Sequence, residues 1–431
     1  MGRSEVAGGF TRRSFLRGAG AAALFATAGG TLSACGNSGG ATAIRFSATK
    51  RETVKYWNDV VAEYNASQSE YKIMRELSTN LVADFVRDTP VPIGLAGFDI
   101  KFGSYVQRGV LADQRDNPIV ETLRPDAIEF SRQFGTYKDD ISSLPYSIAG
   151  QGVIYNREMF AKVGAEIPKT WSDMLAVCEK LKSAGITPFM GTFTDLWTIK
   201  QGPFNYAFGG MLNASEFFAK LNALGTQATD SSEVSFQKDF KAPLVKIKEL
   251  LPYFNSDAKN IAYDQGNRDV GQGKAAMLMQ GPWAYAGILN ANPDFKGGMF
   301  PLPMTDDPAN IVVTANLDLT AFTPASGKGA TRDGALKFLD YIFRTDVLHK
   351  YNAENQAFSP DKDAPKQEDP LVSDLNEYML SGRYVQGPSL YVPAAIPLET
   401  YIQEYFYGGS VDEFLFKLDR DWRRLAVRLA A

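Results

Sequence analysis

The chain has 431 residues, 45% hydrophobic and 12% aromatic, which exceeds the size of one ordinary compact domain. A net charge of -4, with no basic run beyond the N-terminus, argues against nucleic-acid binding. The only histidine, His349, argues against a histidine-dependent zinc site or a Ser-His-Asp triad, and we expect no metal or other cofactor.

Residues 1–34 have the pattern of an export signal. Arg12 and Arg13 precede an apolar run from Ala19 to Leu32, which is too short for a comfortable membrane span. The arginine pair, followed by Phe-Leu, resembles a twin-arginine (Tat) signal, and the LSAC sequence ending at Cys35 looks like a bacterial lipobox. These motifs predict lipid attachment to Cys35, a flexible tether over 35–42, and anchoring on the outer face of the cytoplasmic membrane. The alternative is a coincidental cysteine inside an ordinary cleaved signal.

The second cysteine, Cys178, has no partner for an intramolecular disulfide if Cys35 carries lipid. It shares an apolar helix face with Met174, Leu175 and Leu181. We expect a buried structural thiol.

Strands and helices alternate at the start of the exported part. A strand over 44–48, a helix with Trp57 and Tyr64 on one face, and a strand over 71–77 predict a parallel sheet covered by helices. Residues 99–103 look like a further strand that ends in a glycine loop.

The middle of the chain contains the clearest helix. Thr170 and Asp173 form a capping box at its start, and Gly185 ends it. An aromatic and glycine-rich loop is expected over 193–208. Residues 213–274 are predicted to be mostly helical, with breaks around 225–235 and 255–260.

Residues 273–288 combine a buried strand with a helix start. The apolar run 275–279 has no polar face, Gln280 and Gly281 break it, and Pro282 suits the first turn of a helix. Trp283 therefore stands at the carboxyl end of a buried strand, where open α/β sheets bind ligands. From spacing alone, core packing is an equally good interpretation of Trp283.

The C-terminal part predicts a strand over 316–322 and an amphipathic helix over 332–351, with His349 near its end as a cap or surface group. A last helix begins after Ser410, with Glu413 completing a capping box.

Three stretches together resemble one family. They are the segment LPYSIAGQGVIYNREMFAKVGAEIPKTWSDMLAVCEKLKSAGITPF, the segment GKAAMLMQGPW, and the C-terminal segment GPSLYVPAAIPLETYIQEYFYGGSVDEFL. They are similar to the extracellular solute-binding proteins of ABC importers, and more narrowly to the carbohydrate-binding branch that includes maltose-binding protein. The resemblance covers most of residues 43–425.

The resemblance implies an α/β fold of two lobes, each a mostly parallel sheet flanked by helices, with a ligand cleft between them. One lobe would hold 43–153 plus 317–352, and the other 154–316 plus 353–431. Binding of a sugar or oligosaccharide would close the lobes, and the closed form would deliver it to the transmembrane subunits of an ABC permease. We expect a monomer.

The same resemblance suggests a binding site. Trp283 matches the family's cleft tryptophan, and Trp197 and Tyr391 lie where further stacking aromatics often occur. Other expected contacts come from charged, aromatic and amide side chains: Lys50, Asp99, Phe102, Gln151, Asp195, Asn316 and Asp318. For the last four, turn capping or hinge hydrogen bonding is an equal alternative. The sequence departs from the family at Phe98-Asp99, where Pro-Asp is usual, and at 316–318, which replace a glycine-rich turn, so maltose specificity cannot be transferred.

An enzyme would need a catalytic constellation. The sequence lacks a P-loop, a G-x-S-x-G elbow and an HExxH motif. The acid pairs at 139–140 and 306–307 are typical of solvated turns rather than of glycosidase carboxylates. We therefore expect no catalysis; the alternatives are a surface-tethered carbohydrate-active enzyme and a sugar sensor or adhesin without transport.

Overall fold

The computed structural model describes residues 40–77, 80–229 and 232–430. The predicted signal and Cys35 lie outside these residues. No helix in the described ranges is long and apolar enough to cross a membrane.

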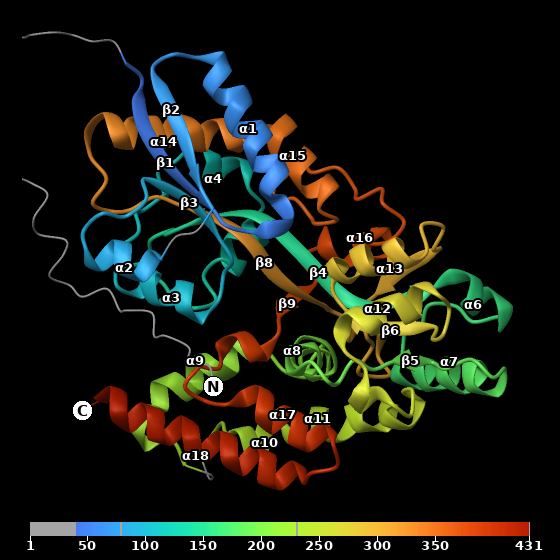
Figure 1. Ribbon diagram of the computed structural model, residues 1–431. Coiled ribbons are helices and arrows are strands. Elements are labelled where there is room, and N and C mark those ends of the chain that lie inside the picture. The colour runs from blue at the N-terminus through green and yellow to red at the C-terminus, as the bar shows by residue number, and fades with distance from the viewer. Residues whose placement is uncertain (1–39, 78–79, 230–231, 431) are drawn as a thin grey trace, which may run out of the picture. The chain divides into compact units, whose positions relative to one another are not determined.

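The described strands form a nine-stranded arrangement in the order β2-β1-β3-β8-β4-β6-β5, with β7 on β4 and β9 on β8 (Figure 1). Their bounds are β1 Thr42–Ala48, β2 Tyr71–Glu76, β3 Ile93–Ala96, β4 Leu144–Asn156, β5 Phe189–Met190, β6 Met277–Gln280, β7 Gly297–Phe300, β8 Val313–Phe322 and β9 Tyr384–Gln386. The strands expected over 44–48, 71–77, 275–279 and 316–322 are confirmed within a few residues.

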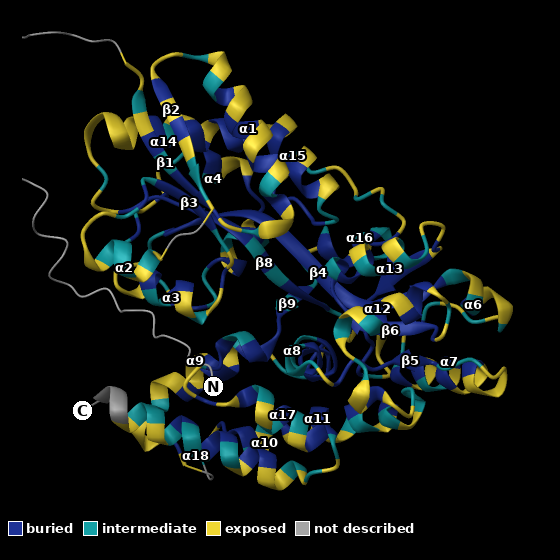
Figure 2. Ribbon diagram, viewed as in Figure 1, coloured by how far each residue is buried: buried dark blue, intermediate teal, exposed yellow. Residues whose placement is uncertain are grey.

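Strand β4 joins two sets of strands. Its first part pairs with β8 from Leu144 to Gln151, and its last part pairs with β6 and β7 from Gly152 onward. Every residue of β4 is buried, so the strand is dark blue along its length in Figure 2. A strand buried on both faces needs near-continuous small and apolar side chains, as in its sequence LPYSIAGQGVIYN.

The sheets are mixed rather than mostly parallel. Four pairings are parallel (β1–β2, β1–β3, β5–β6 and β8–β9), and four are antiparallel (β3–β8, β4–β8, β4–β6 and β4–β7). The antiparallel pairs arise because β4 and β8 run through the middle in opposite directions. Local strand–helix alternation could not reveal this, since β8 is distant in sequence from its partners.

Helices cover the strands and extend away from them. In Figure 1, α1 and α14 run beside β1 and β2, while α9, α10, α11, α17 and α18 pack with one another. The bounds are α1 Val54–Ser67, α2 Leu81–Val86, α3 Ile100–Gln107, α4 Ile119–Thr122, α5 Pro125–Phe130, α6 Arg157–Lys162, α7 Trp171–Ser183, α8 Leu196–Ile199, α9 Ala214–Leu224, α10 Phe236–Asp239, α11 Lys241–Ile247, α12 Tyr263–Gly271, α13 Tyr285–Ala291, α14 Gly329–Ile342, α15 Thr345–Glu354, α16 Asn376–Met379, α17 Leu398–Phe406 and α18 Val411–Ala430.

Helix α7 begins as its capping residues predict. The Thr170 hydroxyl accepts a hydrogen bond from the Asp173 amide at 3.0 Å, and the Asp173 carboxylate accepts one from the Thr170 amide at 3.1 Å. Gly185 follows the last turn with φ +72°, a conformation that favours glycine.

Three local predictions were wrong. Residues 99–103 begin helix α3 instead of a strand, because the Asp99 carboxylate caps the helix and the apolar side chains of Phe102, Tyr105 and Val106 follow helical spacing. The expected loop over 193–208 contains α8 and further helical turns over Lys200–Phe204. The expected helix over 332–351 is two helices, α14 and α15.

The core beneath β1, α1 and α14 is built around Trp57. Its indole is fully buried and contacts four aromatic rings, with centroid distances of 5.2 Å to Tyr56, 5.5 Å to Phe46, 5.5 Å to Tyr146 and 5.4 Å to Tyr351. The contacts with Phe46 and Tyr56 are edge-to-face, a geometry that adds to the stabilisation from buried area.

Cys178 is buried in the apolar face of α7, as expected. Burial raises the pKa of its thiol well above the ordinary value, because the thiolate would lose hydration. In a Cys35→Ser chain, we therefore expect Cys178 to resist the thiol reagent DTNB at pH 8 and to react rapidly in 6 M guanidinium. The absorbance of released thionitrobenzoate checks this; rapid reaction of the folded chain would contradict the buried placement.

Candidate functional site

Trp283 lies in the one-turn helix Pro282–Ala284 that follows β6. Its indole is half-buried, so part of the ring surface is open to solvent. Gly281 holds no side chain because an added Cβ would overlap the Trp283 ring. The glycine and the proline before the tryptophan thus fix where the ring lies.

The side chain of Gln280 connects the two predicted tryptophan positions. Its amide oxygen accepts a hydrogen bond from Trp283 Nε1 at 3.1 Å, and its amide nitrogen donates to the backbone oxygen of Thr198 at 3.1 Å. Thr198 follows Trp197 in α8. Gln280 therefore links the Trp283 indole to the backbone of α8 next to Trp197, although these residues are distant in sequence.

Trp197 packs edge-on against Tyr263, with ring centroids 4.7 Å apart at 61°. Both rings are half-buried. Burial, with smaller contributions from the carboxylates of Asp264 and Glu52, raises the pKa of Tyr263 to about 12. The Tyr263 phenol is thus neutral at physiological pH and can donate a hydrogen bond.

Asp195 fixes the helix that carries Tyr263. Its carboxylate accepts a hydrogen bond from the Tyr263 amide at 2.6 Å, at the first residue of α12. This contact is the capping role that the sequence predicts as the alternative to ligand binding for Asp195.

Two amide side chains lie on one face of the β4–β8 pair. In the antiparallel register, Gln151 of β4 lies opposite Thr314 of β8, and Ala149 of β4 lies opposite Asn316 of β8. Both amide atoms of Gln151 and the Asn316 Oδ1 atom are buried without a hydrogen-bond partner. Leaving such a group unpaired costs about 1–3 kcal/mol, so these atoms are candidates for pairing with a solute. Gly152, next to Gln151, is the register partner of Gln280, so the backbone that carries Gln151 runs beside the strand that leads to Trp283.

Lys50 and Asp318 form an ion pair at 2.6 Å. Lys50 comes shortly after β1. Asp318 lies on β8 two residues after Asn316, so its side chain points to the same face of the strand as that of Asn316. The hinge-bonding alternative for Asp318 is compatible with this contact.

Asp99 lines a pocket of ≈ 470 Å³ with Lys101, Leu196, Lys200 and Glu399. The volume lies within the range of about 300–1,000 Å³ that is usual for small-molecule sites. Lys200 pairs with Glu399 across the pocket wall. Because Leu196 precedes Trp197, the pocket and the aromatic group share α8.

Two predicted residues are packed inside the protein. Phe102 is 3% exposed and contacts Phe98 and Phe322. Tyr391 is 4% exposed, stacks on Phe218 at 4.9 Å, and donates its hydroxyl to Gln133 at 2.6 Å. Their packing interactions occupy the surfaces that a ligand would need, so we leave both out of the proposed site.

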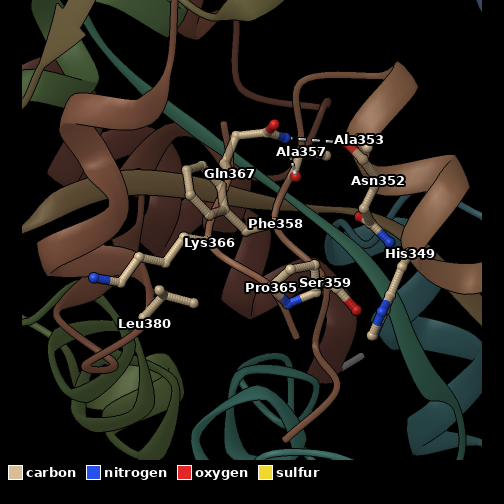
Figure 3. A pocket seen from close by; sticks show the side chains of 10 residues that line it. All are labelled: His349, Asn352, Ala353, Ala357, Phe358, Ser359, Pro365, Lys366, Gln367 and Leu380. Atoms are coloured by element: carbon tan, nitrogen blue, oxygen red, sulfur yellow. Dashed lines mark hydrogen bonds between the residues drawn. The ribbon is translucent and has the colours of Figure 1, made fainter. Parts of the chain in front are cut away.

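His349 lies in a separate small pocket (Figure 3). Its Nε2 atom is 3.0 Å from Asp361 Oδ2, and nearby Gln367 donates to the Ala357 carbonyl at 3.0 Å. The pocket holds ≈ 30 Å³, which suits water but not a sugar ring. In the described ranges, no three or more His, Cys, Asp or Glu residues are placed to hold a metal ion.

Sequence reasoning missed Tyr263, Lys200 and Glu399 as site residues, and noted Gln280 only as a strand end. Gln280 stands directly before the Gly-Pro-Trp turn, which was a usable signal. Nothing local marked Tyr263, because its role depends on the contact with Trp197.

The family model for bacterial extracellular solute-binding proteins matches residues 76–347. The chain belongs to this family.

Curated relatives include an uncharacterized ABC transporter extracellular-binding protein of Pyrococcus horikoshii, 26% identical over 316 residues, or 70% of this chain and 66% of the relative. The multiple sugar-binding protein of Streptococcus mutans is 25% identical over 213 residues, or 49% of each chain. The sn-glycerol-3-phosphate-binding periplasmic protein of Brucella abortus is 28% identical over 325 residues, or 69% of this chain and 70% of the relative. The chain thus spans about half to two thirds of the length of the first two relatives.

Among solved structures, RafE in complex with raffinose aligns with a TM-score of 0.71 and 18% identity, covering 89% of this chain and 100% of RafE. This likeness shows the two-lobed α/β fold of solute-binding proteins.

Proposed function

We propose that this protein captures a sugar or oligosaccharide outside the cytoplasm and delivers it to the permease of an ABC importer. The observations that carry the proposal are the contact between Trp197 and Tyr263, the hydrogen bonds by which Gln280 joins the Trp283 indole to the backbone of α8, and the buried, unpaired amide of Gln151. Aromatic faces suit the apolar C–H surfaces of pyranose rings, and amides suit their hydroxyls. Relatives named for multiple sugars and for raffinose support this ligand class.

We propose that the protein works by lobe closure without catalysis, as a monomer. The sequence predicts lobes of 43–153 plus 317–352 and of 154–316 plus 353–431. Support comes from β4, which changes pairing partners between Gln151 and Gly152. Phe358 pairs with Ile148, and the Lys362 backbone N–H donates to the Thr122 carbonyl, so we assign residues 353–362 to the first lobe instead of the second.

A ligand screen tests the proposed function. We expect a thermal shift with one class of sugar, since a ligand at a hundredfold excess over its dissociation constant stabilises the folded state by about 2.7 kcal/mol. Amino acids serve as the control class. A rise in melting temperature with amino acids alone would contradict the sugar assignment. An unchanged melting temperature with every solute would contradict solute capture.

We propose that the protein is exported by the Tat route and anchored by lipid on Cys35, which lies outside the described residues. The support is the Arg12-Arg13 motif and the LSAC sequence. Cells expressing the Cys35→Ser chain should release the protein from the membrane fraction, while Cys178→Ser should leave it bound. Immunoblots of fractionated cells measure this, and retention of the Cys35→Ser chain would contradict the anchor.

A further inference from the structure

The charges of the site bear on which solutes it accepts. A phosphate group binds proteins through unpaired cations and through free N–H groups at helix N-termini. The family relatives of this chain include both sugar-binding and glycerophosphate-binding proteins, so the two ligand chemistries must be told apart by the site itself.

Two lysines of the site, Lys50 and Lys200, are already paired. Lys50 contacts Asp318 at 2.6 Å, with their side chains 30% and 22% exposed, and Lys200 contacts Glu399. A phosphate that approached either ammonium group would also meet the carboxylate beside it. The repulsion would offset the attraction, because both partners are partly shielded from water.

The helix N-termini of the site are occupied as well. The Asp99 carboxylate accepts a hydrogen bond from the Phe102 amide at 2.8 Å and caps α3. The Asp195 carboxylate accepts one from the Tyr263 amide at 2.6 Å and caps α12. The protein's own carboxylates therefore stand where these helices would hold an anion.

The remaining charges around the site do not favour an anion. Lys101 and Arg51 are exposed to solvent, close in sequence to the carboxylates of Asp99 and Glu52. Glu52 also acts on Tyr263, whose pKa it helps to raise. Apart from Lys101, the unpaired groups are neutral: the amide of Gln151 and the Oδ1 atom of Asn316.

We propose that the site selects uncharged polyhydroxy solutes and rejects phosphorylated ones, through carboxylates that pair its lysines and cap its helices. This inference rests on the proposed function and adds the charge class of the solute.

Calorimetric titration of the purified protein tests the inference. The probes are the sugar that gives the largest thermal shift, sn-glycerol 3-phosphate and glucose 6-phosphate, each at 50 and 500 mM NaCl. We expect the sugar to bind with a dissociation constant that changes less than about twofold with salt, because no net charge is neutralised. Both phosphates should bind at least about a hundredfold more weakly.

Two variants probe the mechanism. Asp318→Asn frees Lys50 and Glu399→Gln frees Lys200, and at least one should strengthen sn-glycerol 3-phosphate binding about tenfold and make it salt-sensitive. The matched control is Asp59→Asn, which breaks an exposed pair with Lys55 at 2.6 Å and should change nothing. The melting temperature of each variant shows that it is folded.

The outcomes separate the two proposals. Phosphate binding as tight as that of the best sugar would overturn the charge selection and leave solute capture intact. Unchanged phosphate affinity in both folded variants would overturn the role of the paired carboxylates. If no probe of either kind binds, the proposed function fails and the charge selection fails with it.

Discussion

Trp283→Ala is expected to raise the dissociation constant for the sugar by about 30-fold, equivalent to about 2 kcal/mol of binding free energy. The half-buried ring supplies an apolar face to the solute and is held in place by Gln280 and Gly281. Because an alanine offers neither the surface nor the hydrogen bond, the loss should appear mainly as faster dissociation. Isothermal titration measures the affinity and stopped-flow fluorescence measures the rate.

Trp171→Phe is the matched control. Trp171 is 4% exposed and its indole donates to Glu249 at 3.0 Å, in α7 and away from the site. We expect a lower melting temperature and a dissociation constant within about twofold of the original. Equal losses of affinity in Trp283→Ala and Trp171→Phe would mean that Trp283 acts through stability and not through contact with the solute.

Trp57→Ala should lower the free energy of unfolding by about 3–5 kcal/mol, the range found when large aromatic side chains are removed from cores. The substitution empties the centre of a cluster in which Phe46, Tyr56, Tyr146 and Tyr351 all contact the indole. Guanidinium denaturation followed by far-UV circular dichroism measures the change.

Val86→Ala gives the comparison for that experiment. Val86 is 81% exposed, so its truncation should alter the free energy of unfolding by no more than about 0.5 kcal/mol. A loss of less than about 1 kcal/mol in Trp57→Ala would show that the cluster around Trp57 is not a main source of stability.

Local sequence signals predicted the elements whose structure is set locally. The capping box of α7 and the Gly-Pro-Trp turn after β6 need only neighbouring residues, and both were predicted correctly. Helix α3 was missed because its short run of side chains also fits strand alternation. The deciding contacts, such as the close packing of Gly103 against Phe134, come from distant sequence.

The candidate site was predictable only in part. A family resemblance pointed to Trp283 and Trp197, and in the structure Gln280 links the Trp283 indole to the backbone of Thr198, the neighbour of Trp197. It also pointed to Tyr391 and Phe102, whose burial depends on Phe218 and Phe322, residues that no local pattern connects with them. The pairing of Lys50 with Asp318 joins residues 268 positions apart, which sequence spacing cannot reveal.

The most direct test of sugar capture at this site is a crystal structure of the protein with the sugar that gives the largest thermal shift. We predict a sugar ring stacked on the indole of Trp283, with hydroxyls hydrogen-bonded to the amides of Gln151 or Asn316 and no phosphate or metal required for binding. A sugar bound elsewhere on the protein, with Trp283 and both amides unchanged and uncontacted, would contradict the account.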